Sequence, residues 1–302
     1  MTLVLSVHNR KTTWMLTDRR LSAGSRVVRD DAMKTMILET HDGVAILGYA
    51  GLGATARGTE PSEWMSATLR GMDGLTLEQA LQALTDAAAR ELPRHLTLSA
   101  AGHVILATGF VRGKGAKLYG IHVEGGPSGR RYIFTSYQRT TDLWSDCPRI
   151  AMAGSGAYSL ERKRGRWQRE LFNILKAHDK GRVSDRFVAN HLARLNYEVH
   201  REEASVGPRC IVVTKRNSEL APMMSGGGSD YYIGRVREAD SRLIPCISNG
   251  MDVTQLVALS LEAMKTKLEG PISESGFLPK TDRDEMNRKI EKLPWDSDPR
   301  LR

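Results

Sequence analysis

Three side chains near the start of the chain could together turn a hydroxyl into a nucleophile. Removal of Met1 would leave Thr2 at the N-terminus, and the small threonine side chain permits that removal. A free α-amine has a pKa of about 7.7–8.0 and can accept the hydroxyl proton. The ammonium of Lys34 would lower that pKa, Asp18 would hold the lysine in place, and Arg20 would brace the same bend. The set predicts attack of the threonine hydroxyl on a carbonyl carbon.

The elements that must position these side chains are strands near the N-terminus. Two β-rich runs, Thr2–Val7 and Thr12–Thr17, are separated by a short polar segment and predict a hairpin. A polar, arginine-rich bend covers residues 18–31. Two further strands, Thr35–Glu39 and Val44–Leu47, are joined at an Asp-Gly step typical of a tight turn. Because these runs are apolar at nearly every position, we expect strands that are covered on both faces.

Helices and strands then arrive in groups. Pro61–Met72 opens with proline in its first turn, and in Thr76–Leu92 the side chains of Thr76 and Gln79 can form a capping box. Four strands, two helices and one strand follow, at His103–Arg112, Lys117–Val123, Arg131–Tyr137, Arg149–Ala153, Tyr158–Lys176, Ser184–His200 and Arg209–Lys215. This order predicts an α/β (α+β) fold with two stacked sheets between two helical layers, a four-layer αββα sandwich.

The composition changes after residue 216. A glycine-rich segment around 223–229 is followed by one strand, Asp230–Gly234, and one amphipathic helix, Val253–Leu268. Beyond Pro271 the chain is charged and contains several prolines, so we expect roughly the last 30 residues to be poorly ordered or to pack on a neighbouring subunit. We therefore predict a domain over residues 1–216 and a C-terminal extension over 217–302.

The spacing of the reactive residues resembles that of a known family. Asp18, in an Asp-x-Arg step with Arg20, follows Thr2 by 16 residues, and Lys34 follows Thr2 by 32. Both separations are similar to those in proteasome β-type subunits and their bacterial HslV relatives, which belong to the N-terminal nucleophile (Ntn) hydrolase superfamily. The resemblance covers about residues 2–216, although the strand region 103–153 is longer than is usual in that family.

Further site residues are implied by the resemblance alone. Gly48 matches the glycine whose N–H forms the family's oxyanion hole. Ser155, in a Gly-Ser-Gly step, matches a serine near the nucleophile. Ser205 matches the serine of a later Asp-x-x-Ser pair, in which Glu202 replaces the usual aspartate. If the S1 pocket forms as in the family, its lining is apolar and favours hydrophobic P1 residues. The lining residues would be Leu21, Ala32, Ile46 and Ala50.

The resemblance implies a threonine hydrolase that cleaves peptide bonds through an acyl-enzyme ester on Thr2. It also implies a peptide or unfolded protein as substrate, a homo-oligomeric ring, and an ATPase unfoldase as partner. Two alternatives stay open: a catalytically silent proteasome-like subunit for assembly or binding, and an Ntn amidase that acts on a small molecule. A silent subunit has no need of Thr2, Asp18 and Lys34 together. The mass in solution would separate a ring from a small-molecule amidase.

The net charge of +9 permits an acidic partner. The densest basic stretch, residues 162–166 with Arg169, falls in an expected helix whose other side is apolar. We interpret it as a solvated helix face. Nucleic-acid binding is the weaker alternative, because neither an aromatic platform nor zinc-ligand spacing accompanies the charge.

No cofactor, metal or membrane partner is expected. The three cysteines are odd in number and widely spaced, which predicts neither disulfides nor a zinc site and fits a reducing cytoplasm. His191 and His200 share a helix but have no carboxylate at ligand spacing. No apolar run approaches the ~18 residues that cross a bilayer, and the first residues lack the features of a signal peptide.

Overall fold

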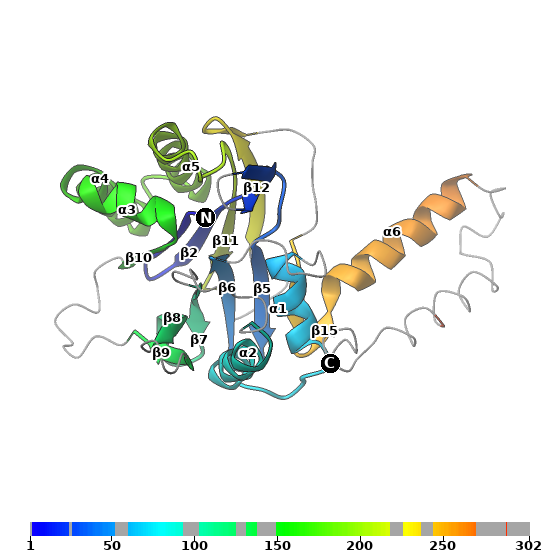
Figure 1. Cartoon of the computed structure of the whole chain (residues 1–302). Helices are drawn as coiled ribbons and strands as arrows, with labels where there is room; N and C mark the ends of the chain where they lie inside the picture. Colours follow the sequence, from blue (N-terminus) through cyan, green and yellow to red (C-terminus); the bar gives the residue numbers. More distant parts are fainter. Residues whose placement is uncertain are drawn as a thin grey trace.

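The chain forms a mixed α+β structure, as predicted. The structure is a computed structural model that describes residues 2–23, 26–51, 60–92, 103–124, 131–137, 149–217, 226–236, 244–269 and 288. Within these residues there are a six-stranded sheet, a seven-stranded sheet, a two-stranded sheet and six helices. Figure 1 shows helices on the outer sides of the two large sheets, with α6 (Val253–Glu269) projecting away from them.

The six-stranded sheet holds the N-terminal strand in its interior. Its order is β10-β1-β2-β11-β12-β13, and all its pairings are antiparallel. The strands are β1 (Val4–His8), β2 (Thr12–Asp18), β10 (Arg149–Ala153), β11 (Arg209–Arg216), β12 (Gly226–Tyr232) and β13 (Arg235–Val236). Every residue of β1 and β2 is buried, because these strands are covered on both faces.

The seven-stranded sheet has the order β15-β14-β5-β6-β7-β8-β9, and only β14 and β5 pair in parallel. Its strands are β5 (Thr35–Thr40), β6 (Gly43–Ala50), β7 (Val104–Val111), β8 (Gly115–Glu124), β9 (Arg131–Ser136), β14 (Cys246–Ser248) and β15 (Met251–Asp252). Residues after 216 therefore add strands to both large sheets, through β12–β13 and β14–β15. The boundary at residue 216 stays a prediction.

The polar bend expected over residues 18–31 contains a small hairpin instead. It consists of β3 (Leu21–Ala23) and β4 (Arg26–Arg29), which form the two-stranded sheet. The sequence did not predict β4, because its two valines, Val27 and Val28, lie between arginines and form too short an apolar run. Val27 and Val28 are both exposed, so this strand does not rest on core packing.

Helices cover the outer faces of both sheets. The first pair is α1 (Pro61–Leu69) and α2 (Leu77–Glu91), and α2 begins with the predicted capping box of Thr76 and Gln79. The single helix expected over Tyr158–Lys176 is instead two helices, α3 (Ser155–Arg162) and α4 (Arg164–Asp179). Lys163, with φ −110° and ψ 18°, lies outside helical geometry and separates them. The last of the group is α5 (Asp185–Glu202).

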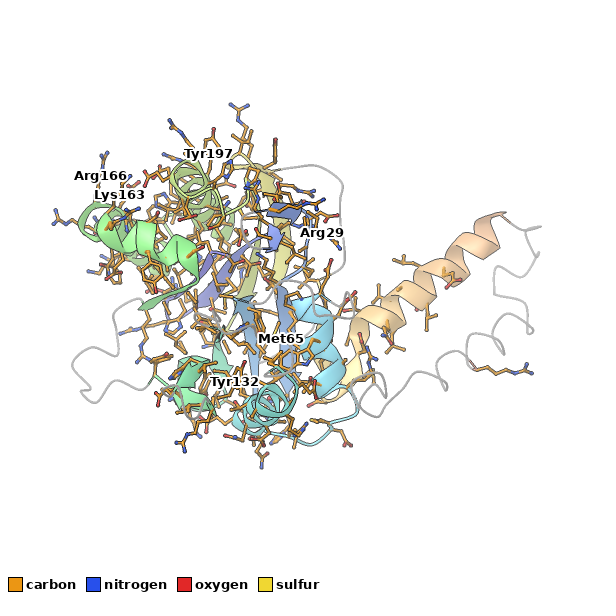
Figure 2. The ribbon with its side chains drawn as sticks, viewed as in Figure 1. Arg29, Met65, Tyr132, Lys163, Arg166 and Tyr197 are labelled. Atoms are coloured by element: carbon orange, nitrogen blue, oxygen red, sulfur yellow. The ribbon has the colours of Figure 1, made fainter. Side chains whose placement is uncertain are left out.

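Three apolar clusters hold these elements together. One lies between α1, α2 and the seven-stranded sheet, and includes Met65 and Tyr132, which are labelled in Figure 2. A second lies between α3, α4, α5 and the six-stranded sheet, around Trp14 and Leu171. The third lies between the two sheets, and its members are Val4, Met15, Met33, Ile46, Ala50, Leu106, Ala153, Ile211 and Val213. The two sheets thus pack face to face.

Two predictions from the sequence meet different outcomes in the C-terminal part. The expected helix is present as α6, attached to the body next to β14 and β15. The predicted disorder of the last residues falls outside the described part of the chain, apart from residue 288. Among the described residues, no helix has both the length and the apolar character needed to cross a membrane.

The close approach of β6 and β7 gives a test of the fold. A Cβ at Gly109 would lie 1.9 Å from the carbonyl oxygen of Val44, so Gly109→Ala must push the two strands apart. We expect the free energy of unfolding to fall by about 1–3 kcal/mol or more in urea denaturation. Gly165→Ala is the control, because a Cβ there meets nothing within 4 Å. On the exposed face of α4 it should raise stability by about 0.5–1 kcal/mol. Equal effects of the two changes would contradict this packing.

Candidate active site

The three side chains singled out by their spacing meet just before β1. Thr2 Oγ1 donates a hydrogen bond of 2.7 Å to Asp18 Oδ1, and Lys34 Nζ donates one to Thr2 Oγ1. Lys34 Nζ also lies 3.0 Å from Asp18 Oδ1. Thr2, Asp18 and Lys34 are only 3%, 0% and 1% exposed. The hydroxyl therefore touches an amine and a carboxylate that are both shielded from bulk water.

Asp18 is the acceptor on which this arrangement converges. Besides Thr2 and Lys34, its Oδ1 accepts the N–H of Leu3 at 2.8 Å. Its Oδ2 accepts the N–H groups of Arg20 at 3.0 Å and Gly207 at 3.1 Å. Backbone donors satisfy a carboxylate without adding mobile side chains. One side chain thus connects the start of β1, the end of β2 and the segment before β11.

Lys34 is held so that it can exchange a proton. Burial lowers the pKa of its ammonium below the ordinary 10.5, and the neighbouring Asp18 carboxylate opposes that shift. Lys34 Nζ also donates to the backbone carbonyl of Arg20 at 2.6 Å. Oriented in this way, its neutral form can take a proton from Thr2 Oγ1.

The two sheets fix the distance between Asp18 and Lys34. Asp18 ends β2 and Lys34 immediately precedes β5, so the two residues belong to different sheets. Their neighbours, Thr17 and Thr35, share a hydrogen bond of 2.6 Å between their hydroxyls across the interface. The contact between the sheets thereby sets the geometry of the ion pair.

The backbone of Thr2 is fixed by the segment that leads into α3. Its carbonyl oxygen accepts the N–H of Gly156 at 3.2 Å. Gly154 adopts φ +90°, and a Cβ at this position would lie 2.1 Å from the Thr2 oxygen. Only glycine fits there, because both the conformation and the space exclude a side chain. The glycines of the Gly154-Ser155-Gly156 step therefore hold the threonine in place.

Arg20 forms hydrogen bonds with two segments near the bend that follows Asp18. Its guanidinium makes two hydrogen bonds to Asp30, of 2.6 and 2.7 Å, and a third of 2.6 Å to the carbonyl oxygen of Ala204. The hydrogen bond to Asp30 raises the pKa of Arg20. Arg20 therefore links the β3–β4 hairpin to the residues before Ser205.

The two predicted serines contact each other, but their acidic partner is not the predicted one. Ser155 Oγ lies 2.9 Å from Ser205 Oγ, which donates a 2.6 Å hydrogen bond to Glu203 Oε1. That bond holds the pKa of Glu203 below its usual value. Glu202 points elsewhere and pairs with Lys163. Glu203 therefore takes the contact expected of Glu202. The register of the last turn of α5, which ends at Glu202, decides which glutamate turns toward the serines.

Gly48 is not placed to supply an oxyanion N–H. The bonds Tyr49 N–H to Lys34 O and Arg112 N–H to Asp42 O fix the alternation along β6. They make Gly48 and Leu106 a hydrogen-bonded pair, so the N–H of Gly48 belongs to the sheet. Its missing side chain has a packing role instead, since a Cβ would lie 2.9 Å from atoms of Val4 and Met15. The expected oxyanion role of Gly48 is therefore wrong.

The residues expected to line an S1 pocket are all buried. Ile46 and Ala50 belong to the cluster between the two sheets, with Val4 and Met15. Leu21 and Ala32 lie near the site, in β3 and just before Met33. Their roles in substrate binding stay predictions.

Three residues of the site were not singled out from the sequence. Glu203 could not be told from Glu202, Gly154 was noted only as part of a step, and Gly207 gave no signal because its contribution is a backbone N–H. Among the described residues, no group of three or more His, Cys, Asp or Glu side chains could hold a metal ion.

The convergence on Asp18 gives a second test. Asp18→Asn leaves Lys34 buried without a counter-ion, so we expect a loss of about 3–5 kcal/mol in the free energy of unfolding. The control is Asp31→Asn, which breaks an ion pair with Arg29 whose side chains are 39% and 34% exposed. That change should cost about 0–1 kcal/mol. Similar small losses in both variants, measured by urea denaturation, would show that Asp18 does not organise the site.

The comparisons with known proteins give a distant likeness of structure only. No family model matches the chain, and no curated protein matches it. A solved structure of an Anbu (Gly-1) mutant from Hyphomicrobium sp. strain MC1 is 14% identical, with a TM-score of 0.48, and the match covers 89% of this chain and 100% of that one. A second Anbu structure from that strain is also 14% identical, with a TM-score of 0.46 and coverage of 90% and 98%.

These findings correct the family suggested by the spacing. The chain was expected to belong with proteasome β-type subunits and HslV. No family model supports that assignment, and the two similar structures are Anbu proteins. The prediction of a proteasome β-type or HslV-like subunit is therefore wrong, and no activity is taken from so distant a likeness.

Proposed function

We propose that this chain is a threonine hydrolase that cleaves amide bonds, with Thr2 as its nucleophile after Met1 is removed. One observation carries the proposal: the buried Thr2 hydroxyl contacts both Lys34 Nζ and the Asp18 carboxylate. A threonine in an ordinary strand has no need of a buried amine and carboxylate on the same oxygen. Burying that pair is costly, and the cost is understandable if the pair activates the hydroxyl.

The reaction begins at the contact between Lys34 and the hydroxyl. Thr2 Oγ1 attacks the carbonyl carbon while its proton passes to the neutral amine of Lys34, which gives a tetrahedral oxyanion. We assign to Lys34 the role of base that the sequence suggested for the α-amine of Thr2, because Lys34 Nζ contacts Oγ1. The C–N bond then breaks, the leaving amine takes a proton from the freed α-ammonium of Thr2, and an ester remains on Oγ1. Asp18 stabilises the lysine ammonium that forms beside it.

Water completes the cycle. The neutral α-amine takes a proton from the water that adds to the ester, and Lys34 returns its proton to Oγ1 as the carboxylic acid leaves. The hydrogen-bonded residues Ser155, Ser205 and Glu203 hold in place the segment whose Gly156 N–H binds the Thr2 carbonyl, and so keep Thr2 positioned during this step. We assign to Glu203 the supporting role first given to Glu202.

The fold around the site supports the same class of enzyme. We infer that the face-to-face sheets and their outer helices form the four-layer αββα sandwich of N-terminal nucleophile hydrolases, since each of the three interfaces has its own apolar cluster. Peptides as substrates, the homo-oligomeric ring and the ATPase unfoldase stay predictions. Native mass spectrometry would test the ring.

Covalent labelling tests the nucleophile. The purified protein should begin at Thr2 and gain the mass of one β-lactone inhibitor, seen by intact-mass spectrometry and N-terminal sequencing. Thr2→Ala should lose the adduct because it has no hydroxyl. Thr2→Ser is the matched control and should keep it, since serine offers the same oxygen. An N-terminal Met1 with no adduct on the folded protein would favour the silent assembly subunit instead.

The role of Lys34 is tested by pH. Because burial lowers the pKa of Lys34 below 10.5, its neutral form is reached at lower pH, and the labelling rate should rise with pH along a limb centred below 10.5. Lys34→Arg keeps the positive charge but cannot lose its proton near neutral pH. It should slow labelling about 10²–10⁴-fold at every pH tested, with circular dichroism checking the fold. Unchanged labelling in Lys34→Arg would show that the α-amine acts alone.

A further inference from the structure

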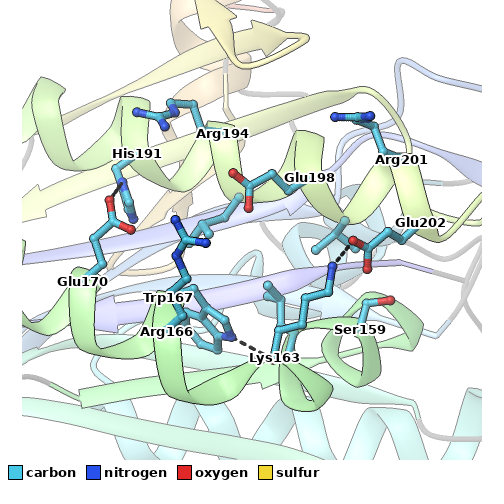
Figure 3. Close-up of a pocket in the computed structure, with 13 residues that line it drawn as sticks. Ser159, Lys163, Arg166, Trp167, Glu170, His191, Arg194, Glu198, Arg201 and Glu202 are labelled. Atoms are coloured by element: carbon cyan, nitrogen blue, oxygen red, sulfur yellow. Dashed lines mark hydrogen bonds and ion pairs between the residues drawn. The ribbon is translucent and has the colours of Figure 1, made fainter.

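A groove separates α5 from α3 and α4, on the outer side of the six-stranded sheet (Figure 3). Its volume is about 640 Å³, within the usual range for small-molecule sites. Thr2, Asp18 and Lys34 do not line it. Glu202 does, whereas the next residue, Glu203, contacts the active-site serine Ser205. The groove is therefore separate from the site of catalysis.

One buried side chain that lines this groove has a buried ring nitrogen without a hydrogen-bond partner among the described residues. The His191 side chain is only 8% exposed, and among the described residues its Nε2 finds no hydrogen-bond partner. Its Nδ1 lies 3.7 Å from Glu170 Oε1, beyond hydrogen-bonding distance. A buried polar atom without a partner is costly, which points to a ligand that completes it.

Basic side chains of the groove are also left without partners. Lys163 is paired with Glu202, but neither Arg166 nor Arg194 forms an ion pair with any residue that the structure describes. Figure 3 shows the guanidinium of Arg166 reaching from α4 into the groove, between His191 and Glu198. The groove thus offers unpaired guanidinium N–H donors next to an unpaired imidazole nitrogen.

The charges of the lining select the ligand. Four basic side chains stand against three acidic ones, so with neutral His191 the lining carries one excess positive charge. One negative charge on a ligand would neutralise this excess, whereas a doubly charged phosphate would leave a net negative charge beside Glu170 and Glu198. Between the helices, the groove reaches the apolar side chains of Leu160, Trp167 and Leu195. A single carboxylate on an apolar stem matches both features.

We propose that this groove binds a small monocarboxylic acid, with its carboxyl group between Arg166 and His191 Nε2 and its apolar stem against Trp167 and Leu195. The unprotonated Nε2 of His191 and a carboxylate oxygen are both hydrogen-bond acceptors, so they cannot bond each other without an added proton. The charge of the Glu170 carboxylate, which faces Nδ1, favours the neutral tautomer with its proton on Nδ1, so Nε2 can bond an oxygen of the ligand only if a further proton sits between them. Binding therefore takes up one proton.

Proton uptake gives the site a signature of its own. Burial lowers the pKa of His191, although the Glu170 carboxylate opposes the shift. The other charges facing the ring are those of Arg194 and Glu198 on α5 and Arg166 on α4. A bound carboxylate adds negative charge and raises that pKa, so affinity should increase as the pH falls toward the pKa of free His191.

Titration calorimetry with hexanoate tests the proposal on the full-length protein. We expect saturable binding with one site per chain, uptake of about one proton measured in two buffers of different ionisation enthalpy, and no binding of hexanamide. Arg166→Gln should weaken hexanoate binding at least about tenfold. This exposed side chain can be changed without disturbing the core. Arg169→Gln removes an exposed arginine of α4 outside the groove and should leave binding unchanged.

Other outcomes would overturn the proposal. These are no saturable binding of hexanoate to the folded wild-type protein, equal binding of hexanamide, tighter binding of inorganic phosphate, or unchanged hexanoate binding in Arg166→Gln. A peptide with a free carboxyl terminus in place of hexanoate distinguishes a free acid from the end of a chain. Preference for the peptide would reject the small acid. His191→Phe should abolish the proton uptake, and uptake that persists in this variant would exclude His191 as its origin.

Discussion

The buried contact between Lys34 and Asp18 is the constraint on which the rest of the site depends. Removing both charges from water is costly, and the cost is offset only if every remaining donor and acceptor is satisfied. The structure meets this demand with backbone groups: the N–H of Leu3, Arg20 and Gly207 on the carboxylate, and the carbonyl of Arg20 on the ammonium. Each of these groups belongs to a segment that must be held in turn, and the two sheets hold them.

Further ion pairs hold the segments around the Lys34–Asp18 contact. Arg19, next to Asp18, pairs with Asp230 of β12, which also pairs with Arg209 at the start of β11. At the other end of the same sheet, Lys215 of β11 pairs with Glu39 of β5 in a buried bridge between the two sheets. Strand β12 comes from beyond residue 216, so a segment outside the resemblance takes part in fixing the position of Asp18 through its neighbour Arg19. These pairs set register more than they add stability.

The sequence predicted the parts of the site that depend on residue type, and missed those that depend on the direction in which a backbone N–H or a side chain points. Thr2, Asp18 and Lys34 could be chosen because their chemistry and spacing agree, and the structure brings them together. Gly48 was misassigned because spacing along a strand does not say toward which neighbour an N–H points. Glu202 was preferred to Glu203 because it lies three residues before Ser205, and spacing does not say which of two adjacent side chains turns toward the serine. The strands β3, β4 and β14 lack apolar alternation: β3 and β4 are held by pairing with each other, and β14 by pairing with β5, which lies far away along the chain.

The long-range contacts of Asp18 have a consequence for the order of events during synthesis. Gly207 lies 189 residues after Asp18 in the chain, yet its N–H is one of the groups that completes the carboxylate. When only the first strands of a nascent chain have left the ribosome, Thr2 is present but Gly207, which completes the environment of Asp18, has not yet been made. On the proposed function, the chain can become reactive only after β11 has joined β2 and brought the N–H of Gly207 to Asp18. On the same proposal, a chain that has not reached this stage carries the Thr2 hydroxyl without its activating environment, so neither it nor its neighbours at the ribosome are exposed to an active hydrolase.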